Sequence, residues 1–186
     1  GDYNHNDPQW SPDGRTIYVN GIRKPEAEYT WGDSEIYAID LKTLDIKALT
    51  DRKGPDGGPR ISPDGKWIAY TGYDDRNFTS HIANLYLMDA AGSSKRLLAG
   101  GLPSSPSSVD WAPDGTGVYY QMEESGENNL HFAPTSGAVR KITKGAHVLS
   151  GVSLADNGQA AAVLSTPDRP GVLVTFTLAL PDAFNA

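Results

Sequence analysis

The chain has 186 residues, of which 38% are hydrophobic, and it contains no cysteine. Its 16 basic and 23 acidic residues give a formal net charge of −7, which argues against nucleic acid or an anionic membrane as a partner. The lack of cysteine excludes disulfides, thiolate metal ligands and a cysteine nucleophile. No apolar run is long enough to span a membrane and no signal peptide is evident, so we expect a soluble chain of unknown compartment.

One short motif returns along the chain. The run Trp10-Ser-Pro-Asp-Gly recurs from Ile61 and from Trp111, and in altered form as Leu154-Ala-Asp-Asn-Gly, at offsets of 51, 50 and 43 residues. Each copy precedes a stretch rich in β-branched and aromatic residues, which favour strands. A period of this length is typical of repeat proteins built from one supersecondary unit.

The residue types of the motif predict a tight turn. Proline presets φ at the second turn position, aspartate bonds nearby amides, and glycine accepts a left-handed backbone. We therefore interpret the motif as a structural corner between two strands, without a catalytic role. The corner residues are Pro12, Asp13, Gly14, Pro63, Asp64, Gly65, Pro113, Asp114 and Gly115.

The second copy shows the predicted unit most clearly. Strands are expected over residues 59–62, 67–70, 84–89 and 95–98, with little or no helix. Four short antiparallel strands cannot bury both faces alone, so the units should stack as blades. The fold class is therefore all-β, a partial β-propeller of about four blades of four antiparallel strands. The repeats lie near 7–50, 58–99, 108–143 and 151–186.

Alternating apolar residues on the predicted third strands should face neighbouring blades. They are Ile36, Ile39, Leu85, Leu87, Leu130 and Phe132. The fourth copy is expected to lack its outer strand after Phe176-Thr-Leu-Ala-Leu-Pro, as if cut from a longer propeller. Apolar blade faces exposed by such a cut would support dimerisation.

The chain resembles the N-terminal propeller of bacterial serine peptidases of the prolyl oligopeptidase family, in the acylaminoacyl-peptidase and dipeptidyl-peptidase-like branch. The resemblance covers essentially the whole chain, and its more specific stretches are residues 1–14, 71–76, 84–89 and 100–106. The Pro-Asp-Gly repeats themselves are shared with TolB-type propellers. The resemblance implies a parent protein in which a propeller caps a C-terminal α/β-hydrolase domain with a Ser-Asp-His triad.

No catalytic residue is assigned in this chain. It contains no G-x-S-x-G nucleophile elbow, and the hydrolase domain is absent from it. The expected role is therefore to gate and orient peptide substrate, with the hydrolase domain of the parent chain as partner. A TolB-type protein-interaction propeller is the alternative. A sialidase-type propeller is disfavoured, because its aspartate box keeps one residue between Asp and Gly, whereas Asp13 and Gly14 are adjacent.

Substrate or interdomain contacts are expected in the connections between second and third strands, over residues 20–33, 71–83 and 121–128. In the first, Trp31 lies outside the repeat pattern. The second carries Asp74, Asp75 and Arg76, for which a self-paired surface turn is the alternative. In the third, the pair Glu123 and Glu124 is of the kind that dipeptidyl-peptidase relatives use to hold a substrate ammonium, and a solvated acidic loop is the alternative.

Neither a cofactor nor a metal site is predicted. Asp2, Asn4 and Asn6 match the first ligand positions of a calcium loop, but Asp7 replaces its required glycine and Pro8 follows. The four histidines show no paired ligand spacing.

Overall fold

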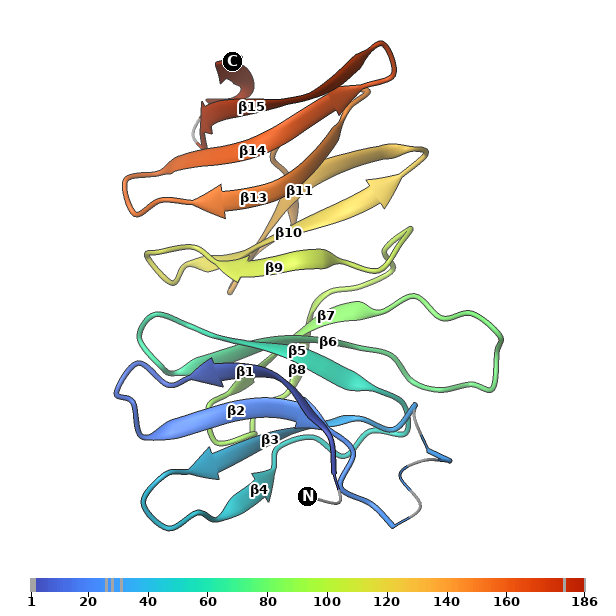
Figure 1. Ribbon diagram of the computed structural model, residues 1–186, viewed down its shortest axis with the longest axis vertical. Helices are drawn as coiled ribbons and strands as arrows, with labels where there is room; N and C mark the ends of the chain where they lie inside the picture. The colour runs from blue at the N-terminus through green and yellow to red at the C-terminus, as the bar shows by residue number, and fades with distance from the viewer. Residues whose placement is uncertain (1–2, 26, 28, 31, 179, 186) are drawn as a thin grey trace. The chain divides into compact units, whose positions relative to one another are not determined.

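The computed structural model describes residues 3–185 except 26, 28, 31 and 179 (Figure 1). The described residues form strands and turns without any helix, and therefore no helix that could cross a membrane. The strands are β1 (His5–Trp10), β2 (Thr16–Gly21), β3 (Glu35–Asp40), β4 (Ile46–Ala48), β5 (Asp56–Ile61), β6 (Trp67–Gly72), β7 (Asn84–Asp89), β8 (Arg96–Ala99), β9 (Ser107–Trp111), β10 (Gly117–Glu124), β11 (Glu127–Pro134), β12 (Arg140–Lys141), β13 (Val148–Leu154), β14 (Gln159–Thr166), β15 (Arg169–Thr177) and β16 (Leu180–Asn185).

The chain divides into two compact units, residues 1–101 and 102–186, which we describe separately. Unit 1 contains two antiparallel sheets of four strands, in the orders β1-β2-β3-β4 and β5-β6-β7-β8. Unit 2 contains the sets β9–β12 and β13–β16, which a single parallel pair, Asn128 with Val148, joins into one sheet of eight strands. We call these sets blades 1 to 4, and they confirm the predicted fold class.

The repeated motif forms the corner between the first and second strands of each blade. Gly14, Gly65, Gly115 and the fourth-copy Gly158 all have a left-handed backbone, with φ of 67°, 72°, 70° and 78°. In blade 1, the Ser11 hydroxyl donates to Asp13 Oδ1 at 2.6 Å and accepts from the Thr16 amide. The motif is thus a hydrogen-bonded turn, as its residue types predict.

Blade 3 closes the same corner with a different hydroxyl. Ala112 occupies the position of Ser11 and Ser62, and Thr116 supplies the missing group from the other side of the turn. The Thr116 hydroxyl donates to Asp114 Oδ1 at 2.7 Å, and the Thr116 amide donates to the same oxygen at 3.0 Å. These hydrogen bonds hold the pKa of Asp114 below its usual value, so the carboxylate stays charged.

The first strand of every blade carries a bulge at the same place. The register of β1, β5, β9 and β13 with its neighbour shifts there, and one left-handed residue lies at each shift. These residues are Asp7, Gly58, Ser108 and Gly151. The bulge therefore belongs to the repeat, although its residue type does not repeat.

Apolar faces of adjacent blades form the core of each unit. In unit 1, Ile36, Ile68 and Met88 are fully buried in one cluster with Tyr18, Leu49 and Tyr70. In unit 2, Leu130, Phe132, Leu149 and Phe176 belong to the corresponding cluster. All six residues predicted to face neighbouring blades are buried except Ile39, which is half-buried.

Two expectations are wrong. Blade 4 does have an outer strand, because β16 pairs with β15 through Thr175 with Asn185 and Thr177 with Leu180. The predicted long loop over 121–128 is instead a tight hairpin, in which only Ser125 and Gly126 lie between β10 and β11. Both turn residues have positive φ, 55° and 82°, as a type I′ turn requires.

The corner predicts a difference between two glycines with equally open surroundings. A Cβ at Gly14 or at Gly32 would meet no atom of the described residues within 4 Å, but of these two glycines only Gly14 has a left-handed φ. Gly14→Ala should therefore lower the free energy of unfolding by about 1 kcal/mol in urea denaturation. Gly32→Ala is the control and should cause no loss. Equal effects would show that the corner does not impose the left-handed conformation.

Candidate functional site

Three connections of unit 1 leave the blades at the same end, opposite the corners. They are the loops 22–34 and 73–83, between second and third strands, and the segment 49–55 that joins the two blades. The register places them together, because Gly21 pairs with Glu35, and Gly72 pairs with both Asn84 and Asp56. We call this region the loop end of unit 1.

A cavity of about 400 Å³ lies between these connections. Tyr29 and Phe78 are 76% and 67% exposed, and they expose large aromatic surfaces where the cavity meets solvent. Two carboxylates, Asp33 and Asp75, line it together with one cation, Lys53. Among the described residues, the lining is Tyr29, Thr30, Gly32, Asp33, Lys53, Pro55, Tyr73, Asp75, Phe78, Thr79 and His81. We call it the loop-end cavity.

Stacked rings order the loop 73–83. The His81 ring lies parallel to Tyr73, with centroids 4.5 Å apart, and it also contacts Phe78 at 5.8 Å. The Arg76 amide donates to His81 Nε2 at 3.2 Å, so this nitrogen is an acceptor and the neutral ring carries its proton on Nδ1. Asp75 Oδ1 lies 3.7 Å from the same nitrogen and becomes its ionic partner only when the ring is protonated.

Arg52 forms a partly buried ionic cluster at the loop end. Its Nε lies 3.0 Å from Asp56 Oδ1, an ion pair without the alignment of a hydrogen bond. Its Nη1 donates to the Tyr86 hydroxyl at 2.7 Å and to Asp74 Oδ1 at 3.2 Å. Burial raises the pKa of Asp56 to about 6 even though Arg52 opposes the shift. The cluster therefore ties loop 73–83 to segment 49–55 and to β7.

Glu35, at the start of β3, is a second buried carboxyl group of this end. It is 4% exposed, and its nearest cation is Lys24, whose Nζ lies 4.0 Å from Oε1. Its Oε2 has no hydrogen-bond partner within the described residues. Burial raises the pKa of Glu35 to about 7, although Thr50 and Lys24 oppose the shift. Near neutral pH, this group is therefore present in both protonation states.

The predicted contact residues of loop 73–83 lie at or beside the loop-end cavity. Asp75 lines it, whereas Asp74 pairs with Arg52, and the exposed Arg76 contributes its backbone amide to His81. The self-paired turn is therefore not formed within the described residues, since Asp74 has a partner elsewhere in the chain. Trp31 lies outside the described residues.

Glu123 and Glu124 lie in unit 2, in the last two positions of β10 rather than in a loop. They pair across the hairpin with Asn128 and Glu127, and both are exposed. Successive residues of a strand point to opposite faces, so the two carboxylates do not converge on a single ammonium. Their predicted role in substrate binding receives no support from this geometry.

Sequence reasoning missed the ionic and aromatic residues that build the loop end. Arg52 is bound to partners 22 and 34 residues away, and no local pattern marks such contacts. Tyr73 and His81 could have been identified from the sequence, because both are aromatic residues in a loop that was predicted to make contacts. Asp56 and Glu35 begin strands, where a charged residue is ordinarily exposed, and only the packing of the two blades buries them.

Four-stranded antiparallel blades, repeated along the chain with apolar faces packed against a neighbouring blade, define a β-propeller segment. The family model described as the TolB beta propeller domain matches residues 7–177. The chain therefore belongs to the TolB β-propeller domain family.

Two curated relatives represent different kinds of protein. Dipeptidyl-peptidase 5 of Porphyromonas gingivalis is 29% identical over 76% of this chain and 21% of its own length. A TolB homologue of Chlorobaculum tepidum is 31% identical over 61% of this chain and 25% of its own length. The chain thus spans about a fifth to a quarter of these relatives.

Among solved structures, puromycin hydrolase is similar over 99% of this chain and 31% of its own, at 19% identity and a TM-score of 0.76. At this identity the likeness concerns the fold. Together with the peptidase relative, it confirms the resemblance to peptidase propellers noted from the sequence.

The two ionic partners of Arg52 predict unequal consequences of mutation. Arg52→Ala leaves the buried Asp56 without its cation and should lower the free energy of unfolding by about 3 kcal/mol at pH 8. Asp74 is 64% exposed, so Asp74→Asn should lower it by less than about 1 kcal/mol. Urea denaturation measures both. Similar losses would show that the pair with Asp56 does not dominate the cluster.

The raised pKa of Glu35 predicts a pH-dependent stability. The folded chain binds more protons than the unfolded chain between about pH 4.5 and 7, so this group favours folding at low pH and loses that effect as pH rises. Glu35→Gln should differ from wild type by less than about 1 kcal/mol at pH 5 and exceed its free energy of unfolding by about 1–3 kcal/mol at pH 8.

The control for this experiment is Glu123→Gln, at an exposed position of unit 2. It should change the free energy of unfolding by less than about 0.5 kcal/mol at both pH values. If Glu35→Gln instead destabilises the chain at pH 8, Lys24 holds Glu35 as a favourable ion pair.

Proposed function

We propose that the chain is a non-catalytic propeller segment of a prolyl oligopeptidase family serine peptidase. In this role it gates and orients peptide substrate for a hydrolase domain elsewhere in the parent polypeptide. The similarity to dipeptidyl-peptidase 5 over 76% of the chain supports the proposal. The observation that carries it is the loop-end cavity, where loops of two blades combine exposed aromatic rings with carboxylates.

The cavity suits contact with an extended peptide. Tyr29 and Phe78 offer apolar surface that a bound side chain would cover, and aromatic residues contribute much of the energy at such contacts. Asp33 is paired with Lys24 at 3.3 Å, so Asp75 is the carboxylate proposed to contact a positively charged group of a substrate. Trp31, Asp74 and Arg76 are proposed as further contacts of the same two loops.

The residues that anchor the loop-end cavity suit it to positioning a substrate rather than to catalysing a reaction. Its loops are anchored by the Arg52 cluster and by the stacked ring of His81, and both attach to strands with buried inner faces. A substrate held by these anchored loops is oriented before it reaches a catalytic group. The same loops also limit which substrates reach that group.

A TolB-type interaction propeller is the second candidate function. The family match and the 31% identity to the Chlorobaculum tepidum protein favour it, since both concern the propeller itself. In that case the loop-end cavity would contact a protein partner. The two proposals differ in whether the parent polypeptide carries a hydrolase.

A peptidase assay separates the two functions. The 186-residue chain and the full-length product of its gene are compared on chromogenic acyl-aminoacyl and dipeptidyl substrates, with and without a serine-directed phosphonate. Activity confined to the full-length protein and abolished by the phosphonate supports the peptidase proposal. Inactivity of both proteins supports the interaction propeller.

In the active full-length protein, Phe78→Ala should raise KM about tenfold and leave kcat nearly unchanged, because it removes binding remote from the reacting bond. Leu44→Ala is the matched control. Leu44 is 71% exposed in the turn between β3 and β4, away from the loop end, and its loss should change neither constant. An unchanged KM in Phe78→Ala would exclude the cavity from substrate binding.

A further inference from the structure

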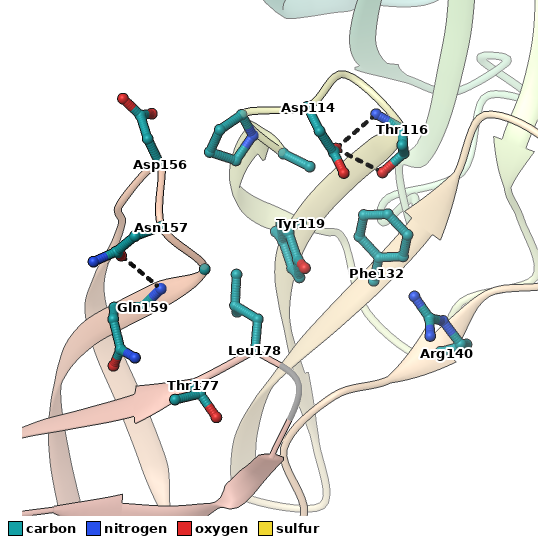
Figure 2. Close-up of a pocket in the computed structure, with 13 residues that line it drawn as sticks. Asp114, Thr116, Tyr119, Phe132, Arg140, Asp156, Asn157, Gln159, Thr177 and Leu178 are labelled. Atoms are coloured by element: carbon teal, nitrogen blue, oxygen red, sulfur yellow. Dashed lines mark hydrogen bonds between the residues drawn. The ribbon is translucent and has the colours of Figure 1, made fainter.

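Unit 2 contains a cleft of about 630 Å³ between the corners of blades 3 and 4. Figure 2 shows Arg140 and Asp156 at opposite ends of this cleft, with Tyr119 and Leu178 between them. Phe132 lies beside Arg140, and Asp114 lies on the blade 3 corner. The cleft therefore has a basic end, an acidic end and apolar surface between them.

The repeat allows a direct comparison with the same place in unit 1. Across blade 1, Tyr18 pairs with Ala38 and Ala38 with Lys47, and across blade 3, Tyr119 pairs with Phe132 and Phe132 with Arg140. Tyr119 therefore occupies the position of Tyr18, and Arg140 that of Lys47.

In unit 1, these two positions hold the neighbouring blade. The Tyr18 hydroxyl donates to the Ala90 carbonyl at 3.4 Å, and Lys47 Nζ donates to the Ala91 carbonyl at 2.9 Å. Both acceptors belong to the turn 90–95 between β7 and β8. Two successive peptide carbonyls thus accept hydrogen bonds from the two donors that blade 1 presents at this place.

In unit 2, the same donors face the cleft. In blade 4, β15 ends at Thr177 and β16 begins at Leu180, so the chain between them is shorter than the turn 90–95 of blade 2. Within the described residues, neither the Tyr119 hydroxyl nor the Arg140 guanidinium has a hydrogen-bond partner. Arg140 instead lies over the Phe132 ring, 5.0 Å from its centroid. Blade 3 therefore presents two hydrogen-bond donors to whatever enters the cleft.

We infer that this cleft binds a short peptide with free ends, whose terminal carboxylate lies at Arg140 and Tyr119 and whose ammonium lies toward Asp156 at the opposite end. A carboxylate supplies the two acceptor oxygens that successive carbonyls supply in unit 1. Arginine in place of lysine favours it further, because the guanidinium fork matches a carboxylate. The acidic end would repel the carboxylate there and attract the ammonium, which fixes the direction of the peptide.

The apolar surface between the two ends accounts for the middle of the peptide. Phe132 and Leu178 line the cleft and belong to or pack against the core of unit 2, so their positions are fixed. An apolar side chain of the peptide would cover this surface. The inference does not depend on the proposed function, since it concerns the corner end of a different unit.

Isothermal titration calorimetry of the 186-residue chain with Ala-Phe-Ala tests the site. Saturable binding is expected, and the C-terminal amide and the N-acetyl form of the same peptide should each bind roughly tenfold more weakly. Absence of saturable binding, or equal binding after either end is blocked, would overturn the inference. The amide of Ala-Glu-Ala tests a side-chain carboxylate as the source and should bind no better than the amide of Ala-Phe-Ala. Binding as strong as that of the free acid would refute recognition of the terminus.

Two variants connect the effect to the named donors. Arg140→Gln should weaken the free acid about tenfold and make acid and amide bind alike, and Tyr119→Phe should weaken the acid several-fold while keeping the ring. Arg169→Gln removes the same charge from an exposed position on β15 outside the lining and should bind as wild type. If Arg140→Gln keeps the preference for the acid, Arg140 is not the carboxylate site.

Discussion

Burial of one blade face against the next is the interaction on which the rest of each unit depends. Hydrogen bonds within a blade complete its sheet but leave its apolar faces uncovered, and burying a single large aliphatic side chain contributes about 1.5–3 kcal/mol. In unit 1, Ile36, Ile68 and Met88 are fully buried between two blades. The loops that form the loop-end cavity begin and end on strands fixed by this packing, so the cavity inherits its geometry from the core.

The loop end is also where apolar packing gives way to buried charge. Arg52, Asp56 and Glu35 lie at strand starts and in the connecting segment, where the blade faces meet the loops. Charges in such a place destabilise the fold unless paired, and here their partners are residues of the loops themselves, such as Asp74 and Lys24. The ordered conformation of the loops and the ionisation of the buried groups therefore depend on the same ion pairs.

The sequence was sufficient for the features that depend on local chemistry. Proline, aspartate and glycine in fixed order predicted the corners, and alternating apolar residues predicted the third strand of blade 2 at its observed bounds, Asn84–Asp89. The bulges were not predictable from residue type, because left-handed Asp7 and Ser108 stand where Gly58 and Gly151 stand in other blades.

The hairpin at Ser125 and Gly126 could have been predicted from the sequence. Two turn residues that include glycine, between stretches of alternating polar and apolar residues, are typical of a β-hairpin. The contacts of Arg52 could not be predicted at all. They depend on which blade lies next to which, and therefore on tertiary packing.

The corner of blade 3 has a consequence for how such repeats diverge. A hydroxyl bonds the turn aspartate in blades 1, 2 and 3, but it comes from the residue before the proline in two of them and from Thr116 in the third. The motif can therefore lose the serine before the proline and still retain the hydrogen bond to the aspartate, provided that a hydroxyl appears at the position after the glycine. A sequence search that scores each position of the motif independently will miss blades whose motif has diverged in this way. A search that accepts a hydroxyl at either of the two positions would recover them.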